Sequence, residues 1–494
     1  MLILACFFLF KNLGNIYLWE DEAVTALLAR STLRLGYPTG FDGVNRIIPA
    51  VGVDSPYWIN EPWLPFYVLA FFFWLFGEST FTARLPFVLF GLGAIGLTYI
   101  LSRRLYSEKG IARIAILLLA FSVPFLILMR TCRYYSPTLF FSLASMIGFI
   151  KLLNKERGSF LLLTLSTVAC YFSNNGLWIP LIMTQIIYLA IFSRDRAVLY
   201  RYGAVLLISL ILAIPWYWLA HTFHFGTGPS LENYRKNLEL YVRSVNKYII
   251  PHAFWILFFI GCALYGRFTK KQFVADFLRD VGKVLRDRSS ILLILWVLMT
   301  LGFLVFVNQR FFRYLSSIFS ALIILHAVLI ERLLRSRLRP LGIAVLLFVL
   351  FSNLLNSPQR ISFPIANYIA EITHDYDGPN EGIILYLKKH AKKTDTVKLY
   401  YEDAPVMFYT GLKVDNRWYT QEETYPEWII PRRPWAEGGF WTSQYYAKIQ
   451  ERYERIEIPY PDIQWENRED LGEHHFRTVR GASNVLLFRR KNGV

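Results

Sequence analysis

The chain has few charged residues for its length of 494 residues. Charged side chains make up only 18% of it, whereas hydrophobic side chains reach 54% and aromatic ones 17%. Apolar runs of membrane-spanning length recur along most of the sequence, which excludes an ordinary soluble globular protein. We therefore expect a polytopic α-helical membrane protein.

Cysteines and acidic residues are also scarce. Of the four cysteines, three lie inside apolar runs and one at the end of such a run, and none follows Cys262. Nothing in this pattern suggests a disulfide framework. The 53 Lys and Arg residues against 36 Asp and Glu give a formal net charge of +17. These bases fall mostly in short loops between apolar runs, which fits membrane orientation better than nucleic-acid binding.

The start of the chain lacks the basic segment and the small-residue cleavage site of a signal peptide. Met1 leads directly into LILACFFLF, which is short for a membrane span. We interpret this stretch as a first transmembrane helix that is shortened by a misassigned start or a truncation.

Hydropathy predicts about eleven membrane spans. The further apolar run 64–76 is too short to span comfortably. If it does not cross, most loop bases fall on one side, which is then cytoplasmic, so we interpret it as a surface helix on the outer face. The predicted spans are 1–13, 84–101, 111–129, 137–153, 159–172, 176–193, 203–220, 251–266, 290–307, 314–330 and 340–356.

This topology predicts two modules. Residues 1–356 form the membrane module, with external loops at 14–83 and 221–250, and residues 357–494 form an extracytoplasmic α/β domain. In the tail, NEGIILYLKKHAKK predicts a helix with Asn380 as its N-cap, and TVKLYY and NVLLFRR predict strands.

The densest acidic cluster of the chain lies in LWEDEAVTALLARSTLRLGYP, residues 18–38. Apolar residues at helical spacing predict an amphipathic helix along the outer surface, ended by Gly36 and Pro38: Val24, Leu27, Leu28 and Leu35. The acids Glu20, Asp21 and Glu22 occupy its first turn, where the helix dipole favours negative charge. That is a sufficient structural reason for them, and by local reasoning it is as plausible as a functional one.

Further polar groups reach the same outer face in this topology. Glu61 precedes the run 64–76, and arginines lie at span ends: Arg84, Arg130, Arg133, Arg310 and Arg313. Arginine binds phosphate with a bidentate fork, and a carboxylate accepts a proton from a hydroxyl. Taken singly, an arginine or tyrosine at a span end is more typical of snorkelling or of the aromatic belt. Their assembly on one face favours an anionic lipid head group with a reaction beside it.

The order of short motifs along the chain resembles that of a known family. DE after the first span is followed by EP, GES…ARLP, RRLYSEKG, RTCRYYSP and RFFRYLSS. This order is similar to that of the GT-C membrane glycosyltransferases, and most similar to the protein O-mannosyltransferases and the bacterial aminoarabinose (lipid A) transferases. The resemblance covers residues 18–357.

The resemblance implies transfer of a hexosyl or pentosyl unit from a polyprenyl-phosphate donor to a lipid, glycan or protein acceptor, with inversion. It implies Asp21 as the general base and Glu22 as a group that orients the site or the acceptor. Substrate-binding roles fall on Glu61, Arg84, Arg130, Arg133, Tyr134, Arg310, Arg313 and Tyr314. It also implies a multi-pass protein of the bacterial inner membrane, with the active site and the tail extracytoplasmic and no nucleic-acid partner.

Some members of this family bind a divalent metal through the acid of the EP segment and a later histidine. Glu61 matches the acid, whereas His221, His224 and His252 give no convincing match, and the EHH stretch at 473–475 is a weaker candidate. Where the family often has a histidine after the fifth span, this chain has SNNG at 173–176. A metal at Glu61 therefore enters only as an option.

A second amphipathic helix is predicted at 231–248 from apolar residues at helical spacing. It could be a lid over the donor site or a static interfacial helix. The main alternative function is a transporter or flippase of lipid-linked sugars. Against it, the charges cluster at one face, no inverted repeat is present, and His326 is the clearest ionisable group inside a span. A polysaccharide polymerase or ligase and a non-catalytic scaffold are further alternatives.

Overall fold

The computed structural model describes residues 2–47, 55–220, 231–269, 271–307, 310–399, 401–416, 423–433, 443–464 and 466–491. The chain divides into two compact units. The first unit holds Met1–Lys11, Phe87–Arg130 and Tyr134–Ile369, and the second holds Asn12–Pro86, Thr131–Arg133 and Ala370–Val494. These boundaries cross the predicted modules 1–356 and 357–494, because much of the predicted first external loop packs with the tail. The two modules stay a prediction.

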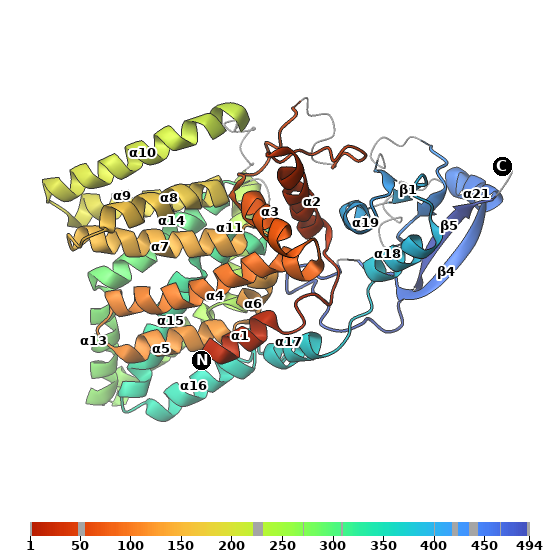
Figure 1. The fold of residues 1–494 in the computed structure, drawn as a ribbon. Helices are drawn as coiled ribbons and strands as arrows, with labels where there is room; N and C mark the ends of the chain where they lie inside the picture. The colour runs from red at the N-terminus through yellow and green to blue at the C-terminus, as the bar shows by residue number, and fades with distance from the viewer. Residues whose placement is uncertain are drawn as a thin grey trace. The chain divides into compact units, whose positions relative to one another are not determined.

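The first unit is helical (Figure 1). It holds most of α4 (Thr80–Leu105) and α17 (Pro364–Thr373). Its other elements are α1 (Leu2–Phe10), α5 (Lys109–Phe121), α6 (Val123–Arg130), α7 (Tyr135–Leu153), α8 (Ser159–Ser173), α9 (Asn175–Phe192), α10 (Arg196–Ala220), α11 (Leu231–Tyr248), α12 (His252–Thr269), α13 (Gln272–Leu285), α14 (Arg288–Val305), the 3₁₀ helix η2 (Phe312–Ile318), α15 (Phe319–Arg335) and α16 (Arg339–Phe351).

Within the described residues, seven helices are long and apolar enough to cross a membrane, or eight if the pair α5–α6, bent by 66°, is one span. The chain is therefore a multi-pass membrane protein. Helices occur at all the predicted spans, but three are short: α1, α8 and α16. Eleven complete spans thus stay a prediction, whereas the polytopic helical class is confirmed.

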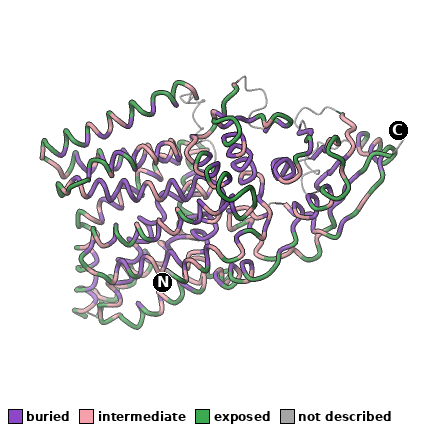
Figure 2. Tube along the Cα trace, in the orientation of Figure 1, coloured by how far each residue is buried: buried purple, intermediate pink, exposed green. Residues whose placement is uncertain are grey.

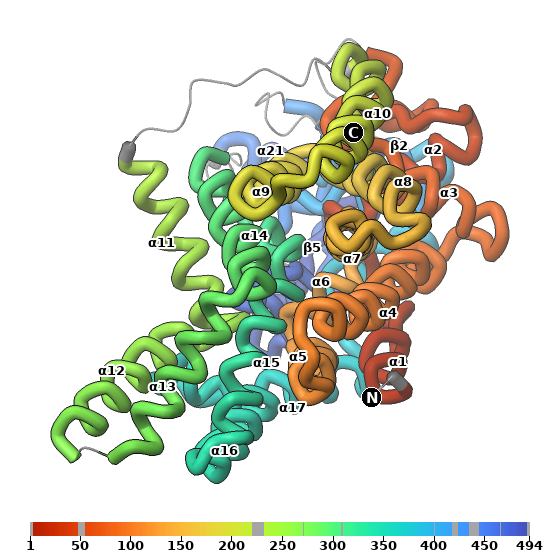
Figure 3. The backbone as a smooth tube through the Cα atoms, turned by 90° about the vertical axis from the view of Figure 1, so that its left-hand side faces the viewer, coloured from red at the N-terminus to blue at the C-terminus, as the bar shows by residue number. Residues whose placement is uncertain are grey.

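Small and polar residues bring the helices of the first unit together. A Cβ on Gly148 of α7 would lie 2.9 Å from the Leu163 backbone of α8, so only glycine permits this approach. Between other helices, the Thr98 and Ser320 hydroxyls hydrogen-bond at 2.7 Å. Most residues of α7 are buried, whereas Trp255 is the one buried residue of α12. Figure 2 shows α10 as a largely exposed helix. Figure 3 shows α12 beside α13, where the two helices contact each other.

Helix α2 (Glu20–Leu35) of the second unit confirms the predicted helix and its end at Gly36. Gly36 has φ +85°, a left-handed conformation that favours glycine, and its N–H bonds to the Thr32 carbonyl. The prediction that this helix lies along the surface with one exposed face is wrong. Nearly every residue from Glu22 to Thr32 is buried, whereas Leu35 is exposed. α2 is enclosed by α3 (Leu64–Phe76) and by α19 (Asp403–Thr410) of the tail.

The tail forms a five-stranded mixed sheet in the order β2-β1-β3-β5-β4. β1 (Thr396–Leu399) pairs in parallel with β2 (Lys413–Asp415) and with β3 (Trp428–Ile430). β5 (Asn484–Arg490) pairs antiparallel with β3 and with β4 (Tyr453–Pro461). Both predicted strands are therefore present, and the α/β character of the tail is confirmed.

After α17, the helices in the described residues of the tail are α18 (Pro379–His390), α19 and α21 (Ser443–Arg452). The N-cap of α18 is Gly378, two residues before the predicted Asn380. The Glu466 carboxylate accepts a hydrogen bond from the Asn380 N–H at 2.8 Å. A Cβ atom at position 378 would lie only 1.9 Å from the Glu466 carboxylate, so position 378 requires glycine.

Candidate active site

Glu22 and Arg84 form a buried ion pair in the second unit. The Arg84 Nε and Nη2 donate to the two Glu22 carboxylate oxygens at 2.9 and 2.7 Å. Its remaining donors reach the carbonyls of Leu13, Ile16 and Tyr17 at 2.8 to 3.4 Å. All five guanidinium N–H groups therefore have acceptors, and both side chains are almost completely buried.

These contacts argue against Arg84 as a phosphate ligand and against Glu22 as a group that contacts the acceptor, whereas they agree with an orienting role for Glu22. A guanidinium whose five donors are engaged has none left for a lipid phosphate. Glu22 also accepts hydrogen bonds from the backbone N–H groups of Cys132, at 2.8 Å, and Trp19, at 3.4 Å. Its carboxylate thus ties α2 to the 131–133 segment, which is a structural role.

Asp21, Glu61 and Arg133 form a second, more accessible cluster. The Arg133 Nη2 and Nη1 donate to the Glu61 carboxylate at 2.6 and 3.2 Å, and Nη1 also reaches the Thr25 hydroxyl at 3.2 Å. The same Nη2 lies 3.7 Å from Asp21 Oδ2. The structure thus brings together three of the predicted site residues.

Exposure separates the adjacent acids of the first turn of α2. The Asp21 side chain is 26% exposed and that of Glu22 only 1%. A general base has to come within hydrogen-bond reach of an incoming hydroxyl. Asp21 meets this condition and Glu22 does not. Arg133, placed between Glu61 and Asp21, orients both carboxylates, and a third anion beside it would be repelled by them.

Glu20, to which the sequence assigned no role, faces the tail. Its carboxylate accepts the Ala404 N–H at 3.2 Å and hydrogen-bonds to the buried Asp403 carboxylate. Burial, together with Asp403 and Glu402, raises the pKa of Glu20 well above its usual range. Burial also raises the pKa of Asp403, although hydrogen bonds from Asn416 and Glu20 oppose this. The two carboxyls are thus hydrogen-bonded to each other in a buried environment that disfavours their charged forms.

Helix α19 holds the acidic turn through further contacts. The Tyr409 hydroxyl accepts the Leu18 N–H at 3.0 Å and hydrogen-bonds to the Thr80 hydroxyl at 2.7 Å. Arg30 of α2 donates to the Phe408 carbonyl at 2.8 Å, and its guanidinium lies 4.4 Å from the centre of the Phe408 ring. Sequence reasoning missed this support, because the partners are separated by several hundred residues.

Arg130 and Tyr134 belong to the first unit. Arg130 Nη1 donates to the carbonyls of Phe8 and Lys11 at 2.9 and 2.8 Å, so it neutralises the carbonyl end of α1. Tyr134 is buried and packs edge-on against Tyr135 at 4.8 Å. For Arg130 this geometry favours a structural role.

Arg310, Arg313 and Tyr314 also lie in the first unit, before and within η2. Arg310 is exposed and donates to the Asn233 side chain of α11 at 2.7 Å. Arg313 is half-buried, and its guanidinium stacks 4.0 Å from the centre of the Phe311 ring. The phosphate-binding role of these residues stays a prediction. α11 confirms the predicted helix at 231–248, whereas the lid remains a hypothesis.

The histidine candidates give no metal site in the described part of the chain, where no group of three His, Cys, Asp or Glu side chains could hold a metal ion. His221 and His224 lie outside the described residues, and His252 bonds to the Asn246 amide oxygen at 2.9 Å. In the EHH stretch, His474 bonds to Glu371 at 2.7 Å and to the Arg468 carbonyl at 2.6 Å. Because Glu61 is already paired with Arg133, we derive no step through a metal.

Comparisons with known proteins agree with this architecture. Residues 60–218 match the sequence model of a family described as dolichyl-phosphate-mannose-protein mannosyltransferase. The crystal structure of ArnT from Cupriavidus metallidurans in the apo state is 12% identical to this chain, with a TM-score of 0.58. The structure of the same protein bound to undecaprenyl phosphate is 14% identical, with a TM-score of 0.59. Each alignment covers 98% of this chain and 96% of the other.

The chain has the GT-C fold. The fold implied by the resemblance to the GT-C membrane glycosyltransferases, which was inferred from the order of short motifs, is thereby confirmed, and the family match over 60–218 agrees with it. No curated protein matches the sequence significantly. Within the GT-C fold, the matched family segment begins next to Glu61 and includes Arg84 and Arg133.

Proposed function

We propose that this chain is a membrane glycosyltransferase that moves a hexosyl or pentosyl unit from a polyprenyl-phosphate donor to an acceptor hydroxyl, with inversion. Its GT-C fold, the mannosyltransferase family match over 60–218 and the undecaprenyl phosphate named for the similar ArnT structure support this proposal. The observation in this chain that carries it is an accessible carboxylate, Asp21, held by an arginine that is itself clamped by Glu61.

In the proposed reaction, Asp21 accepts the proton of the acceptor hydroxyl. The acceptor oxygen forms a bond to the anomeric carbon while the bond from that carbon to the phosphate oxygen breaks, and polyprenyl phosphate leaves as a stabilised anion. Such a leaving group needs cations more than an acid. Arg310 and Arg313 stay the predicted cations, since Arg84 and Arg133 are engaged elsewhere. The site and the tail are proposed to lie on the extracytoplasmic side of a bacterial inner membrane.

The test compares Asp21→Asn with Asp375→Asn, which removes an exposed acid of the tail. The purified protein is reconstituted in liposomes. A polyprenyl-phosphate sugar, labelled in its sugar, is added as the donor, and a membrane extract is added as the source of acceptor. Asp21→Asn should lower kcat by about 10²- to 10⁴-fold, the usual contribution of a general base, while Asp375→Asn keeps the wild-type rate.

A wild-type rate in Asp21→Asn would falsify the catalytic assignment. Movement of the intact lipid-linked sugar across the liposome membrane, without transfer, would instead support the transporter alternative.

A further inference from the structure

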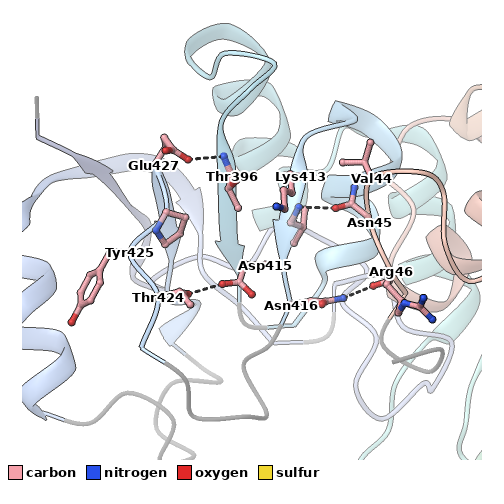
Figure 4. Close-up of a pocket in the computed structure, with 12 residues that line it drawn as sticks. Val44, Asn45, Arg46, Thr396, Lys413, Asp415, Asn416, Thr424, Tyr425 and Glu427 are labelled. Atoms are coloured by element: carbon pink, nitrogen blue, oxygen red, sulfur yellow. Dashed lines mark hydrogen bonds between the residues drawn. The ribbon is translucent and has the colours of Figure 1, made fainter. Parts of the chain in front are cut away.

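A cavity of about 660 Å³ lies in the second unit beside the edge strand β2. Small-molecule sites commonly measure roughly 300–1,000 Å³. Residues 44–46 form one wall, and β1, β2 and the segment entering β3 form the other (Figure 4). No residue that we assign to the reaction lines this cavity.

Hydrogen bonds fix the two walls to each other. The Asn45 amide donates to the Leu412 carbonyl at 2.9 Å and accepts the Val414 N–H at 2.7 Å. The Asn416 amide donates to the Arg46 carbonyl at 2.7 Å. Residues 44–46 therefore border the edge of β2 through side-chain amides, which fixes the shape of the cavity.

The lining balances charge and mixes donors with acceptors. Arg46 and Lys413 carry positive charge, and Asp415 and Glu427 carry negative charge. Thr424 lies beside Asp415, to which it donates at 2.6 Å. Such a lining carries no excess of either charge, and apolar surface from Val44, Tyr425 and Pro426 lies among the polar groups. It suits a neutral ligand rich in hydroxyl groups, each of which can donate and accept.

The cavity is linked to the acidic turn of α2. Asn416 also donates to the Asp403 carboxylate at 3.2 Å, and Asp403 is hydrogen-bonded to Glu20. Glu20 directly precedes Asp21, so two hydrogen bonds connect the cavity wall to the residue before the proposed base. The cavity wall and the acidic turn of α2 therefore belong to one hydrogen-bonded network.

We propose that this cavity binds a saccharide unit of the acceptor, so that the enzyme glycosylates a molecule that already carries sugar. The saccharide site itself stands on the cavity alone. Its assignment to the acceptor rests on the proposed function.

The test measures the binding of oligosaccharides without a lipid to the full chain in lipid nanodiscs, by saturation-transfer NMR. The probes are neutral and amino-sugar oligosaccharides of two to four units. Arg46→Ala and Lys413→Ala remove exposed charged groups of the lining. Each should weaken the best binder about 10-fold, because hydrogen bonds to charged groups contribute about 1.5–3 kcal/mol. The matched variants Arg480→Ala and Lys393→Ala, which change exposed residues of the tail outside the lining, should bind as the wild type does.

Absence of binding by every oligosaccharide, or equal weakening in the matched variants, overturns the proposal. Displacement of the oligosaccharide by millimolar inorganic phosphate also overturns it, because that result indicates an anion site. Asp21→Asn should bind the oligosaccharide with wild-type affinity. If that variant also transfers sugar at the wild-type rate, the proposed function fails, while the saccharide site stands and loses only its assignment to the acceptor.

Discussion

Three consecutive acids begin α2, and each meets a different environment. Glu20 is hydrogen-bonded to the buried Asp403, Asp21 is partly exposed beside Arg133, and Glu22 is buried against Arg84. A helix turns by about 100° per residue, so neighbours in one turn point in different directions. Only the middle acid can meet a substrate, and its two neighbours fix the turn that carries it.

Replacing Glu22 should therefore affect stability before chemistry. Glu22→Gln leaves the Arg84 guanidinium buried without its counter-charge, and breaking a buried pair costs about 3–5 kcal/mol of unfolding free energy. Thermal unfolding in detergent would measure the loss, with Asp21→Asn as the control that keeps the wild-type melting temperature. A stable but inactive Glu22→Gln protein would contradict this and return Glu22 to the reaction.

Arg133 and Glu61 should act as one unit. Arg133→Lys loses the two-pronged contact with Glu61, and Glu61→Gln loses its charge. Each should lower kcat about 10-fold or more through a misplaced Asp21, and the double variant should be little worse than either single one. Rates of the four proteins form a double-mutant cycle. Strictly additive losses would mean that the two residues act separately.

At the scale of elements, α19 is what locks α2 in place. Its residues reach the Leu18 N–H, the Glu20 carboxylate and the Arg30 side chain, which spread along most of α2 and its lead-in. Burial raises the pKa of Tyr409, so its phenol stays neutral and keeps both hydrogen bonds. Through these contacts α19 is expected to support the proposed reaction by holding the turn that carries Asp21.

Removing one hydroxyl should expose this dependence. Tyr409→Phe leaves the Leu18 N–H without an acceptor and should cost about 1–3 kcal/mol of stability. Tyr446→Phe, which alters a half-buried tyrosine of α21, is the matched control and should change stability little. Chemical denaturation monitored by tryptophan fluorescence gives the free energy of unfolding of each variant. Equal free energies for the two variants would argue against the locking role of α19.

Several elements were readable from the sequence, and others were not. Hydrophobic periodicity and helix-ending residues predicted the helix 231–248, the strand 484–490 and the helix that ends at Gly36, because local sequence patterns determine these elements. The short helix 403–410 gave no such signal, since Glu402 before it is left-handed and its partners lie far away in the chain. For the same reason, the sequence grouped Arg84 with Arg133 and could not tell a fully engaged guanidinium from one beside the proposed base.

For the whole molecule, buried acids in the tail make stability depend on pH. Burial and the neighbouring Glu402 raise the pKa of Glu466 to about 8. The nearby Arg432, which opposes this shift, is itself paired with Glu402 and Asp462. A carboxyl whose folded pKa is raised stabilises the fold at low pH and loses that contribution as pH rises from its unfolded value toward the folded one.

The melting temperature of the full chain should therefore fall as pH rises from about 5 to about 9. Glu466→Gln should flatten this dependence, because an amide cannot ionise and can still accept the Asn380 N–H. Scanning calorimetry in detergent across this range provides the measurement, with Glu457→Gln on the strand β4 as the control. A slope that is the same in all three proteins would assign the pH effect to other groups.

The pairing of Glu20 with Ala404, 384 residues apart, has a consequence for biosynthesis. At about 5–20 residues per second, the ribosome needs roughly 20 to 80 s to make the chain between them. During that interval the acidic turn exists without its lock, while the membrane helices are inserted. The acidic turn is thus among the first segments to be made and among the last to gain its contacts, so we expect an unfinished chain in the membrane to lack the support that holds Asp21.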